Sequence, residues 1–135
     1  MTGTGRIAHV RSMSGEGYVT AIRSGRHELV ADEHPAQGGT DAGPSPFTLL
    51  LAGLAACTSI TLTMYAERKG WDLDGVEIDL DLVRDGDQLR IARSISIGAD
   101  LGDEEREALI RIAEKTPVTR AVRSGTPIAT TFAFG

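Results

Sequence analysis

The single cysteine of this chain, Cys57, is the leading candidate for redox or nucleophilic chemistry. Cys57 follows the apolar run LLLAGLAA, well inside a predicted helix. It lies beyond the first helical turn, where the helix dipole lowers the pKa of a thiol, so the local sequence gives it no activation. Two interpretations stay open: a small buried hydrophobic residue, or a nucleophile that needs a cation supplied by the fold.

The segment AEKTPVTRAV contains the next candidates. Pro117 disfavours a helical backbone at Thr116, so one helix should end there, and the proline should begin a second, short helix. Arg120 lies about one helical turn beyond Thr116, and Arg123 follows it. We nominate these two arginines as the cations that approach Cys57. The alternative is that both are surface charges.

No metal ion and no cofactor are predicted. His9, His27 and His34 are isolated and lack the paired spacing that metal ligation on a helix needs. A single cysteine excludes an internal disulfide and a zinc cluster built from cysteines. The glycine-rich runs GEG and GGTDAG lack the strand-to-helix context of a phosphate-binding loop.

Composition limits the class of partner and the compartment. The 135 residues predict a single domain, residues 1–135, and their formal net charge is -5. An acidic chain with scattered Lys and Arg favours neither nucleic acid nor an anionic membrane. The start of the chain lacks a signal-peptide pattern, and its longest uninterrupted apolar run is shorter than the roughly 20 residues that span a bilayer. With one cysteine, these features predict a cytoplasmic protein.

The elements that position the candidate residues follow from hydrophobic periodicity. Alternating runs predict strands at residues 5–12, 17–23 and 26–31, joined as an antiparallel meander. The glycine- and proline-rich run EHPAQGGTDAGP should form a long loop and the mobile rim of a pocket. Ser45-Pro46 begins a long central helix, residues 46–69, whose first half is apolar nearly all round and therefore buried.

The second half of the chain alternates strands and helices. Two alternating runs flank Asp85-Gly86-Asp87 and predict a hairpin. Asp103 should cap an amphipathic surface helix, and the short helix from Pro117 should lead to a last strand, PIATTFAF. The predicted order is βββ-α-ββ-α-α-β, an α+β fold.

Three segments together resemble the OsmC/Ohr-like family of osmotically inducible and organic hydroperoxide resistance proteins. They are GGTDAGPSPFTLLLAGLAACTSITLTMYAERKG, LDGVEIDL and AEKTPVTRAV. The resemblance covers nearly the whole chain and implies an OsmC-like fold. It also implies an intertwined homodimer, in which sheets enclose the central helices and the pockets lie at the subunit interface.

The resemblance also implies site residues. Peroxidase members of the family reduce organic hydroperoxides with two cysteines, an arginine and a glutamate. The first cysteine carries over to Cys57, the second falls on Thr116, and the glutamate falls on Phe47; the loop ADEH, where the arginine would lie, has none. The chain therefore resembles a divergent member that lacks the second cysteine, and a threonine cannot form the disulfide that releases a sulfenic acid.

Two functions follow from this comparison. The first is a stress-response protein that reduces organic hydroperoxides through Cys57 alone, in a peroxiredoxin-like, thiol-dependent reaction. The second is a non-catalytic binding or regulatory dimer that retains the interface pocket for a small apolar ligand, with Phe47, Thr116 and Arg120 as binding residues. Replacement of the glutamate by Phe47 favours the second. A third, structural interpretation, in which side chains fill the pocket, also stays open.

Overall fold

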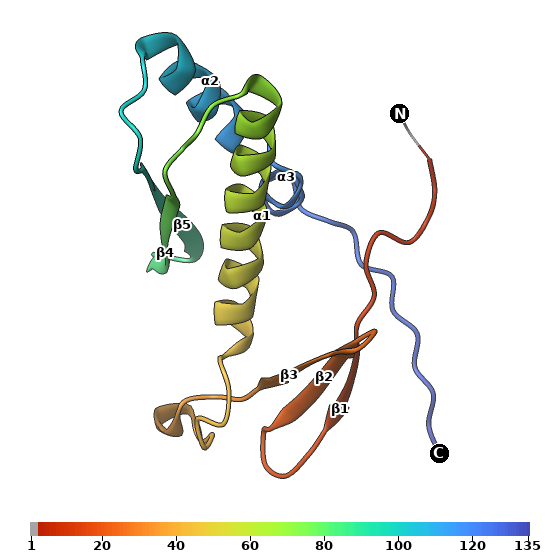
Figure 1. Ribbon diagram of the computed structural model, residues 1–135. Coiled ribbons are helices and arrows are strands. Elements are labelled where there is room, and N and C mark those ends of the chain that lie inside the picture. Colours follow the sequence, from red (N-terminus) through yellow and green to blue (C-terminus); the bar gives the residue numbers. More distant parts are fainter. Residues whose placement is uncertain (1–2) are drawn as a thin grey trace. The chain divides into compact units, whose positions relative to one another are not determined.

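The computed structural model describes residues 3–135. Three helices and two small antiparallel sheets follow one another in the order βββ-α-ββ-α-α, with one short 3-10 turn at Pro35–Gln37 (Figure 1). The α+β class is therefore confirmed. The chain divides into two compact units, Met1–Leu50 and Leu51–Gly135, and each is described by itself.

The first unit begins with the predicted meander. Its strands are β1 (Arg11–Ser14), β2 (Thr20–Ser24) and β3 (His27–Ala31), paired antiparallel in the order β1-β2-β3. The first strand begins at Arg11 rather than at residue 5. Arg11 pairs with Arg23 at the end of β2, so the residues before it have no strand to pair with.

A buried carboxylate organises the loop that follows β3. Asp32 is 2% exposed and accepts hydrogen bonds from the backbone N–H groups of Glu33, Thr40 and Ala42 and from the Thr40 hydroxyl. These bonds, led by that of the Ala42 amide, lower the pKa of Asp32 to about 2. Close packing also fixes the loop, because a Cβ at Gly39 would collide with the Glu33 carbonyl. Mobility of the loop stays a prediction, and Asp32 restrains its centre.

The long helix α1 spans Pro46–Lys69, as predicted. The Ser45 hydroxyl accepts a hydrogen bond from the Thr48 N–H at 3.2 Å, and the chain leaves the helix at Gly70 with a φ of 74°. Its buried residues recur every four positions, at Leu54, Thr58, Leu62 and Ala66. Apolar side chains outside this stripe, including Leu50, Ile60 and Met64, are exposed in the single chain.

By length and composition alone, α1 is long and apolar enough to cross a membrane. In the described chain, 17% of the most apolar 18-residue stretch of α1 is buried. The prediction that no segment is long enough to span a bilayer was wrong, because it considered only the longest uninterrupted apolar run. Threonine and serine residues within α1 interrupt that run without adding charge, so an 18-residue stretch of the helix is long and apolar enough to span a bilayer. A core helix of a soluble protein passes the same test.

The second unit packs a hairpin and two further helices on α1. The strands β4 (Val76–Asp85) and β5 (Gln88–Ile97) form the predicted hairpin, and α2 (Asp103–Ala113) and α3 (Pro117–Ser124) follow. The residue before α2 is Gly102, which is its N-cap, so Asp103 is the first helical residue rather than the cap. The core of this unit consists of Leu62, Ala66, Leu73, Leu109 and Ala113.

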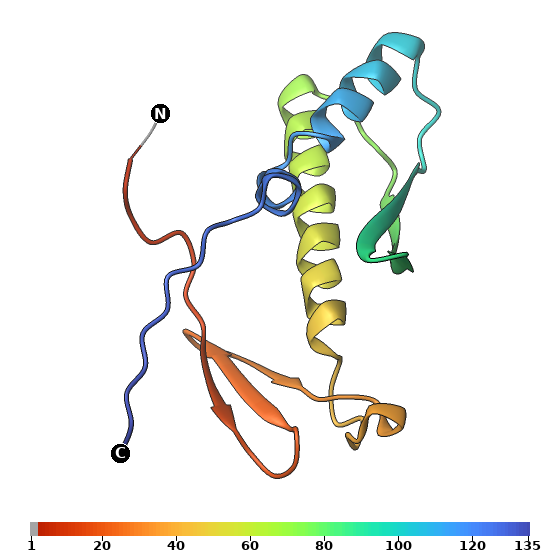
Figure 2. The ribbon, with the colours of Figure 1, turned by 180° about the vertical axis from the view of Figure 1, so that it is seen from behind.

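The last predicted strand is absent from the described chain. Residues 125–135 form no helix or strand, and Figure 2 shows the segment after α3 as an extended chain. Its alternating apolar residues are almost fully exposed: Ile128 at 89%, Phe132 at 81% and Phe134 at 90%. The prediction was wrong for the single chain because a strand needs a neighbour to accept its backbone hydrogen bonds, and this segment has none there.

Candidate functional site

The polar centre of the second unit is built around Arg93 on β5. Residues of β5 alternate between exposed and half-buried, and the inward row contains Ile91, Arg93, Ile95 and Ile97. An arginine thus occupies an inward position among isoleucines. Arg93 is not among the candidate residues predicted from the sequence, although the period-two pattern IARSISI contains the signal.

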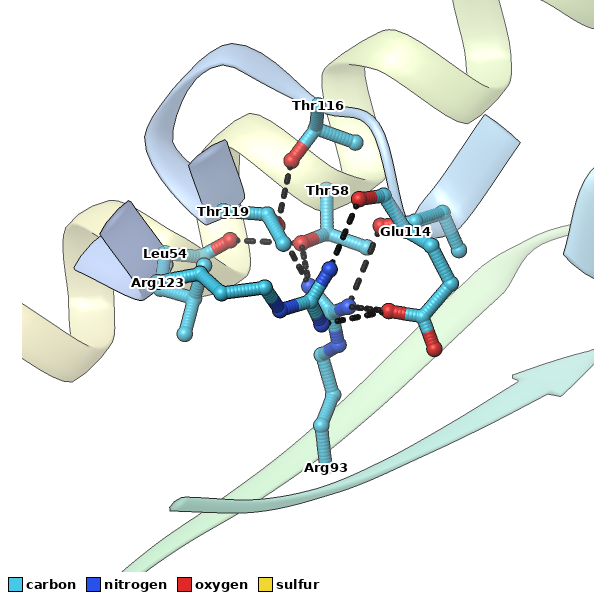
Figure 3. Close-up of polar contacts among 8 residues, drawn as sticks. Leu54, Thr58, Arg93, Glu114, Thr116, Thr119 and Arg123 are labelled. Carbon is cyan, nitrogen blue, oxygen red and sulfur yellow. Dashed lines mark hydrogen bonds and ion pairs between the residues drawn. The ribbon is translucent and has the colours of Figure 1, made fainter. Parts of the chain in front are cut away.

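Three neutral acceptors hold the Arg93 guanidinium (Figure 3). Its Nη1 donates to the Thr58 hydroxyl at 2.9 Å and to the Thr119 hydroxyl at 2.8 Å, and its Nη2 donates to the Ala113 carbonyl at 3.0 Å. The Arg93 side chain is 12% exposed. Arg93 therefore ties the hairpin to α1, to the end of α2 and to α3.

The threonines around Arg93 are themselves fully bonded. The Thr58 hydroxyl donates to the Leu54 carbonyl at 2.7 Å, and the Thr116 and Thr119 hydroxyls lie 2.6 Å apart. Thr58 and Thr116 have no exposed surface. Within residues 3–135, no buried side-chain polar atom of this cluster lacks a hydrogen-bond partner.

One carboxylate serves two arginines at the edge of the cluster. The Glu114 carboxylate lies 2.7 Å from Arg123 Nη2 and 3.5 Å from Arg93 Nη2, and Arg123 Nη1 also donates to the Glu114 carbonyl at 3.1 Å. The hydrogen bond from Arg123 and the charges of both arginines lower the pKa of Glu114. Arg123, which we had nominated as a neighbour of Cys57, instead pairs with Glu114.

The predicted break at Thr116 is confirmed. Thr116 is the N-cap of α3 with extended backbone angles, Pro117 is the first helical residue, and the Arg120 N–H donates to the Thr116 carbonyl at 3.0 Å. The Thr116 side chain faces Thr119 rather than solvent. A hydroxyl in this setting has no redox chemistry, so its contribution in the described chain is to the hydrogen-bond network.

Cys57 lies one residue before Thr58 on α1 and is half-buried with a free thiol. Its recorded polar contact is with the Thr61 hydroxyl, 3.9 Å from the sulfur. Among residues 3–135, no hydrogen bond or ion pair joins Cys57 to an arginine or a carboxylate. Arg120 is exposed on α3, and Phe47, in the first turn of α1, is 53% exposed. Their roles as binding residues stay predictions.

A cavity of about 390 Å³ opens beside the Arg93 cluster, within the second unit. Side chains from α1, β5, the end of α2 and α3 surround it. Cys57 is not among them. The lining residues are Leu54, Leu89, Ile91, Arg93, Glu114, Thr119, Val122 and Arg123.

No metal centre accompanies these features in the part of the chain that the structure describes. Groups of three or more His, Cys, Asp or Glu side chains that could hold a metal ion do not occur there.

Comparison with known proteins identifies the family. The model of the family described as OsmC-like protein matches residues 38–131. No curated protein matches the chain. Among solved structures, the OsmC-like protein from Mycoplasma pneumoniae is 19% identical with a TM-score of 0.76, covering 89% of this chain and 89% of that chain.

Two further similar structures are of proteins named for hydroperoxide resistance. An organic hydroperoxide resistance protein OsmC from Legionella pneumophila is 23% identical with a TM-score of 0.67, covering 90% of this chain and 92% of that chain. The organic hydroperoxide resistance protein of Bacillus subtilis is 25% identical with a TM-score of 0.61, covering 87% and 91%. The fold agrees with these structures, and the family model spans well over half of the sequence. The chain belongs to the OsmC-like family.

Proposed function

We propose that this protein is an OsmC-type stress-response protein that reduces organic hydroperoxides through Cys57 alone, with an external thiol as the reductant. Family membership and neighbours named for hydroperoxide resistance support this reaction class. The presence of a threonine at position 116 limits the mechanism most, because it leaves the chain without a second cysteine. Thr116 stands where the resemblance places the second cysteine, and its hydroxyl is buried against Thr119.

The proposed cycle balances with a single protein sulfur. The Cys57 thiolate attacks the distal oxygen of the hydroperoxide, so an S–O bond forms as the O–O bond breaks, and the alkoxide leaves and takes a proton. The sulfur has then lost two electrons and is a sulfenic acid. One external thiol converts it to a mixed disulfide and water, and a second external thiol restores Cys57 and leaves as the external disulfide.

We also propose that the protein is an intertwined cytoplasmic homodimer and that both units form one domain within it. Exposed apolar side chains on α1 and in the segment after α3 support this assembly, because a second copy could cover both. In such a dimer α1 is a core helix. Light scattering at micromolar concentration tests the proposal, and a monomer mass there would refute it.

A non-catalytic binding dimer is the second candidate. Two observations favour it: Phe47 replaces the glutamate that the resemblance implies, and the hydroxyl of Thr116 is engaged in the Arg93 network. In addition, Cys57 has no recorded cationic partner in the described chain. This candidate predicts that the protein binds a small apolar molecule without consuming it.

Thiol trapping and turnover distinguish the two candidates. We would measure consumption of cumene hydroperoxide with dithiothreitol, and labelling by dimedone after hydroperoxide treatment without thiol. Wild type should turn over and form the dimedone adduct, and Cys57→Ser should do neither; Ser59→Ala, on the same helix, serves as the control. Wild-type turnover that survives in Cys57→Ser would disprove the role of Cys57. Absence of both signals in wild type would favour the binding candidate.

A further inference from the structure

The cavity beside Arg93 has no role in the proposed thiol chemistry, because Cys57 does not line it. Its volume of about 390 Å³ lies within the range of small-molecule sites, which is roughly 300–1,000 Å³. All of its lining residues belong to the second unit. The cavity therefore belongs to the second unit alone.

Charge in this cavity is unbalanced. Arg93 and Arg123 both line it, and the Glu114 carboxylate lies between them at 3.5 and 2.7 Å. Among residues 3–135, no other carboxylate forms an ion pair with either arginine. The remaining acceptors of Arg93 are hydroxyl and carbonyl oxygens, which are neutral. Two guanidinium groups share one carboxylate, so one positive charge is uncompensated.

The two arginines differ in what they can offer an anion. Arg93 is held at both Nη atoms and is 12% exposed, so its charge is fixed at the back of the site. Arg123 is 61% exposed, and its recorded bonds all go to Glu114. The planar guanidinium of Arg123 therefore retains donors for an incoming oxygen.

Apart from Thr119, whose hydroxyl accepts a hydrogen bond from Arg93, the rest of the wall is aliphatic. Leu54 and Ile91 lie deeper, whereas Leu89 is 47% exposed and Val122 is 37% exposed. A ligand that uses this wall needs a short apolar body next to its anionic group. Inorganic phosphate has no such body, and a neutral alcohol has no charge for the arginines.

We propose that this cavity binds a small organic carboxylate, with its carboxylate group at Arg123 and near Arg93 and a short aliphatic chain against Leu54 and Val122. The Glu114 side chain, which is 57% exposed, then acts as an internal competitor for the same guanidinium groups. Because Cys57 takes no part, the site does not depend on the proposed peroxidase reaction.

Two variants, Arg123→Gln and Glu114→Gln, should change the affinity of the site for a carboxylate in opposite directions. Binding of octanoate, below its micellar concentration, would be measured by titration calorimetry on the full chain. Arg123→Gln should weaken binding roughly tenfold or more, because a charge-assisted hydrogen bond is lost. Glu114→Gln should strengthen binding several-fold, since it removes the competing charge. Arg111→Gln, an exposed arginine on the neighbouring helix α2 outside the cavity, should leave binding unchanged.

Further probes separate this site from the alternatives. Octanol and inorganic phosphate should each bind far more weakly than octanoate, and Cys57→Ser should bind octanoate like wild type. Equal binding of octanol, full competition by equimolar phosphate, or unchanged affinity in Arg123→Gln would each overturn the proposal. Tighter binding by Glu114→Gln supports it even if Arg123→Gln unfolds. Circular dichroism of every variant checks the fold, and loss of octanoate binding in Cys57→Ser would instead link the cavity to the thiol.

Discussion

Asp32 in the first unit is buried and Arg93 in the second is 12% exposed, and these two charged side chains are satisfied in different ways. Asp32 takes all its hydrogen bonds from within its own loop, from partners at most 10 residues away. Arg93 lies on a strand, and its partners lie 20, 26 and 35 residues away, in the three helices. Both charges are held mainly by neutral dipoles. A buried charge can therefore organise either one loop or the packing of a whole unit.

This difference predicts how much of the structure each substitution destabilises. Loss of a local network should loosen one loop, whereas loss of a network between distant segments should weaken the whole unit. Three substitutions, taken in order of expected effect, test this comparison. All unfolding measurements need a fixed protein concentration, because association would contribute to stability.

Arg93→Met should have the largest effect. Methionine keeps an apolar stem but leaves Thr58, Thr119 and the Ala113 carbonyl without their donor. We expect a loss of about 3 kcal/mol in the free energy of unfolding, measured by urea titration. Arg93→Lys should recover only part of it, because an ammonium group cannot match the guanidinium fork. A loss below about 1 kcal/mol in Arg93→Met would contradict a unit-wide role.

Thr58→Val should have an intermediate effect. Valine has nearly the same shape but cannot accept the hydrogen bond from Arg93, so we expect a loss of about 1–2 kcal/mol. Thr63→Val, at an exposed position of the same helix, is the matched control and should change stability by less than about 0.5 kcal/mol. In the double variant with Arg93→Met the two losses should not add, because both remove the same bond. Full additivity would count against a shared network.

Asp32→Asn should have the smallest effect on global unfolding and a clear effect on its loop. The Asp32 pKa is lowered from 3.8 to about 2 in the folded protein, so its carboxylate stabilises the fold above about pH 4. That contribution should disappear as the pH falls from about 4 to about 2. Amide hydrogen exchange at Thr40 and Ala42 should be faster in Asp32→Asn at neutral pH. Equal exchange in both proteins would mean that the loop is held by other contacts.

Local signals explain most of what the sequence predicted correctly. Ser45-Pro46 and Gly70 bracket α1, and Asp85-Gly86 marks the hairpin turn, because caps and turns depend on neighbouring residues. The break at Thr116 was found for the same reason. The predicted helix correctly placed Cys57 and Phe47 on α1. The roles of these two residues stay predictions.

Features that depend on distant partners were not predicted. Arg93 was overlooked because its acceptors lie in helices distant in the sequence, and only its place among the inward isoleucines of β5 indicated burial. The segment PIATTFAF has the alternation of a strand, yet alternation cannot supply the neighbouring strand that completes it. Arg123 was predicted either to approach Cys57 or to be a surface charge, and in the described chain it pairs with Glu114.

The long sequence separations around Arg93 also have a kinetic consequence. Its guanidinium can leave water only when the hairpin meets three helices at once, so the cluster should form late on the folding pathway. Interactions absent from the transition state mainly govern the rate of unfolding. Variants at Arg93 should therefore unfold much faster while refolding at nearly the rate of wild type. The arginine would then set the lifetime of the folded unit rather than the speed with which it is made.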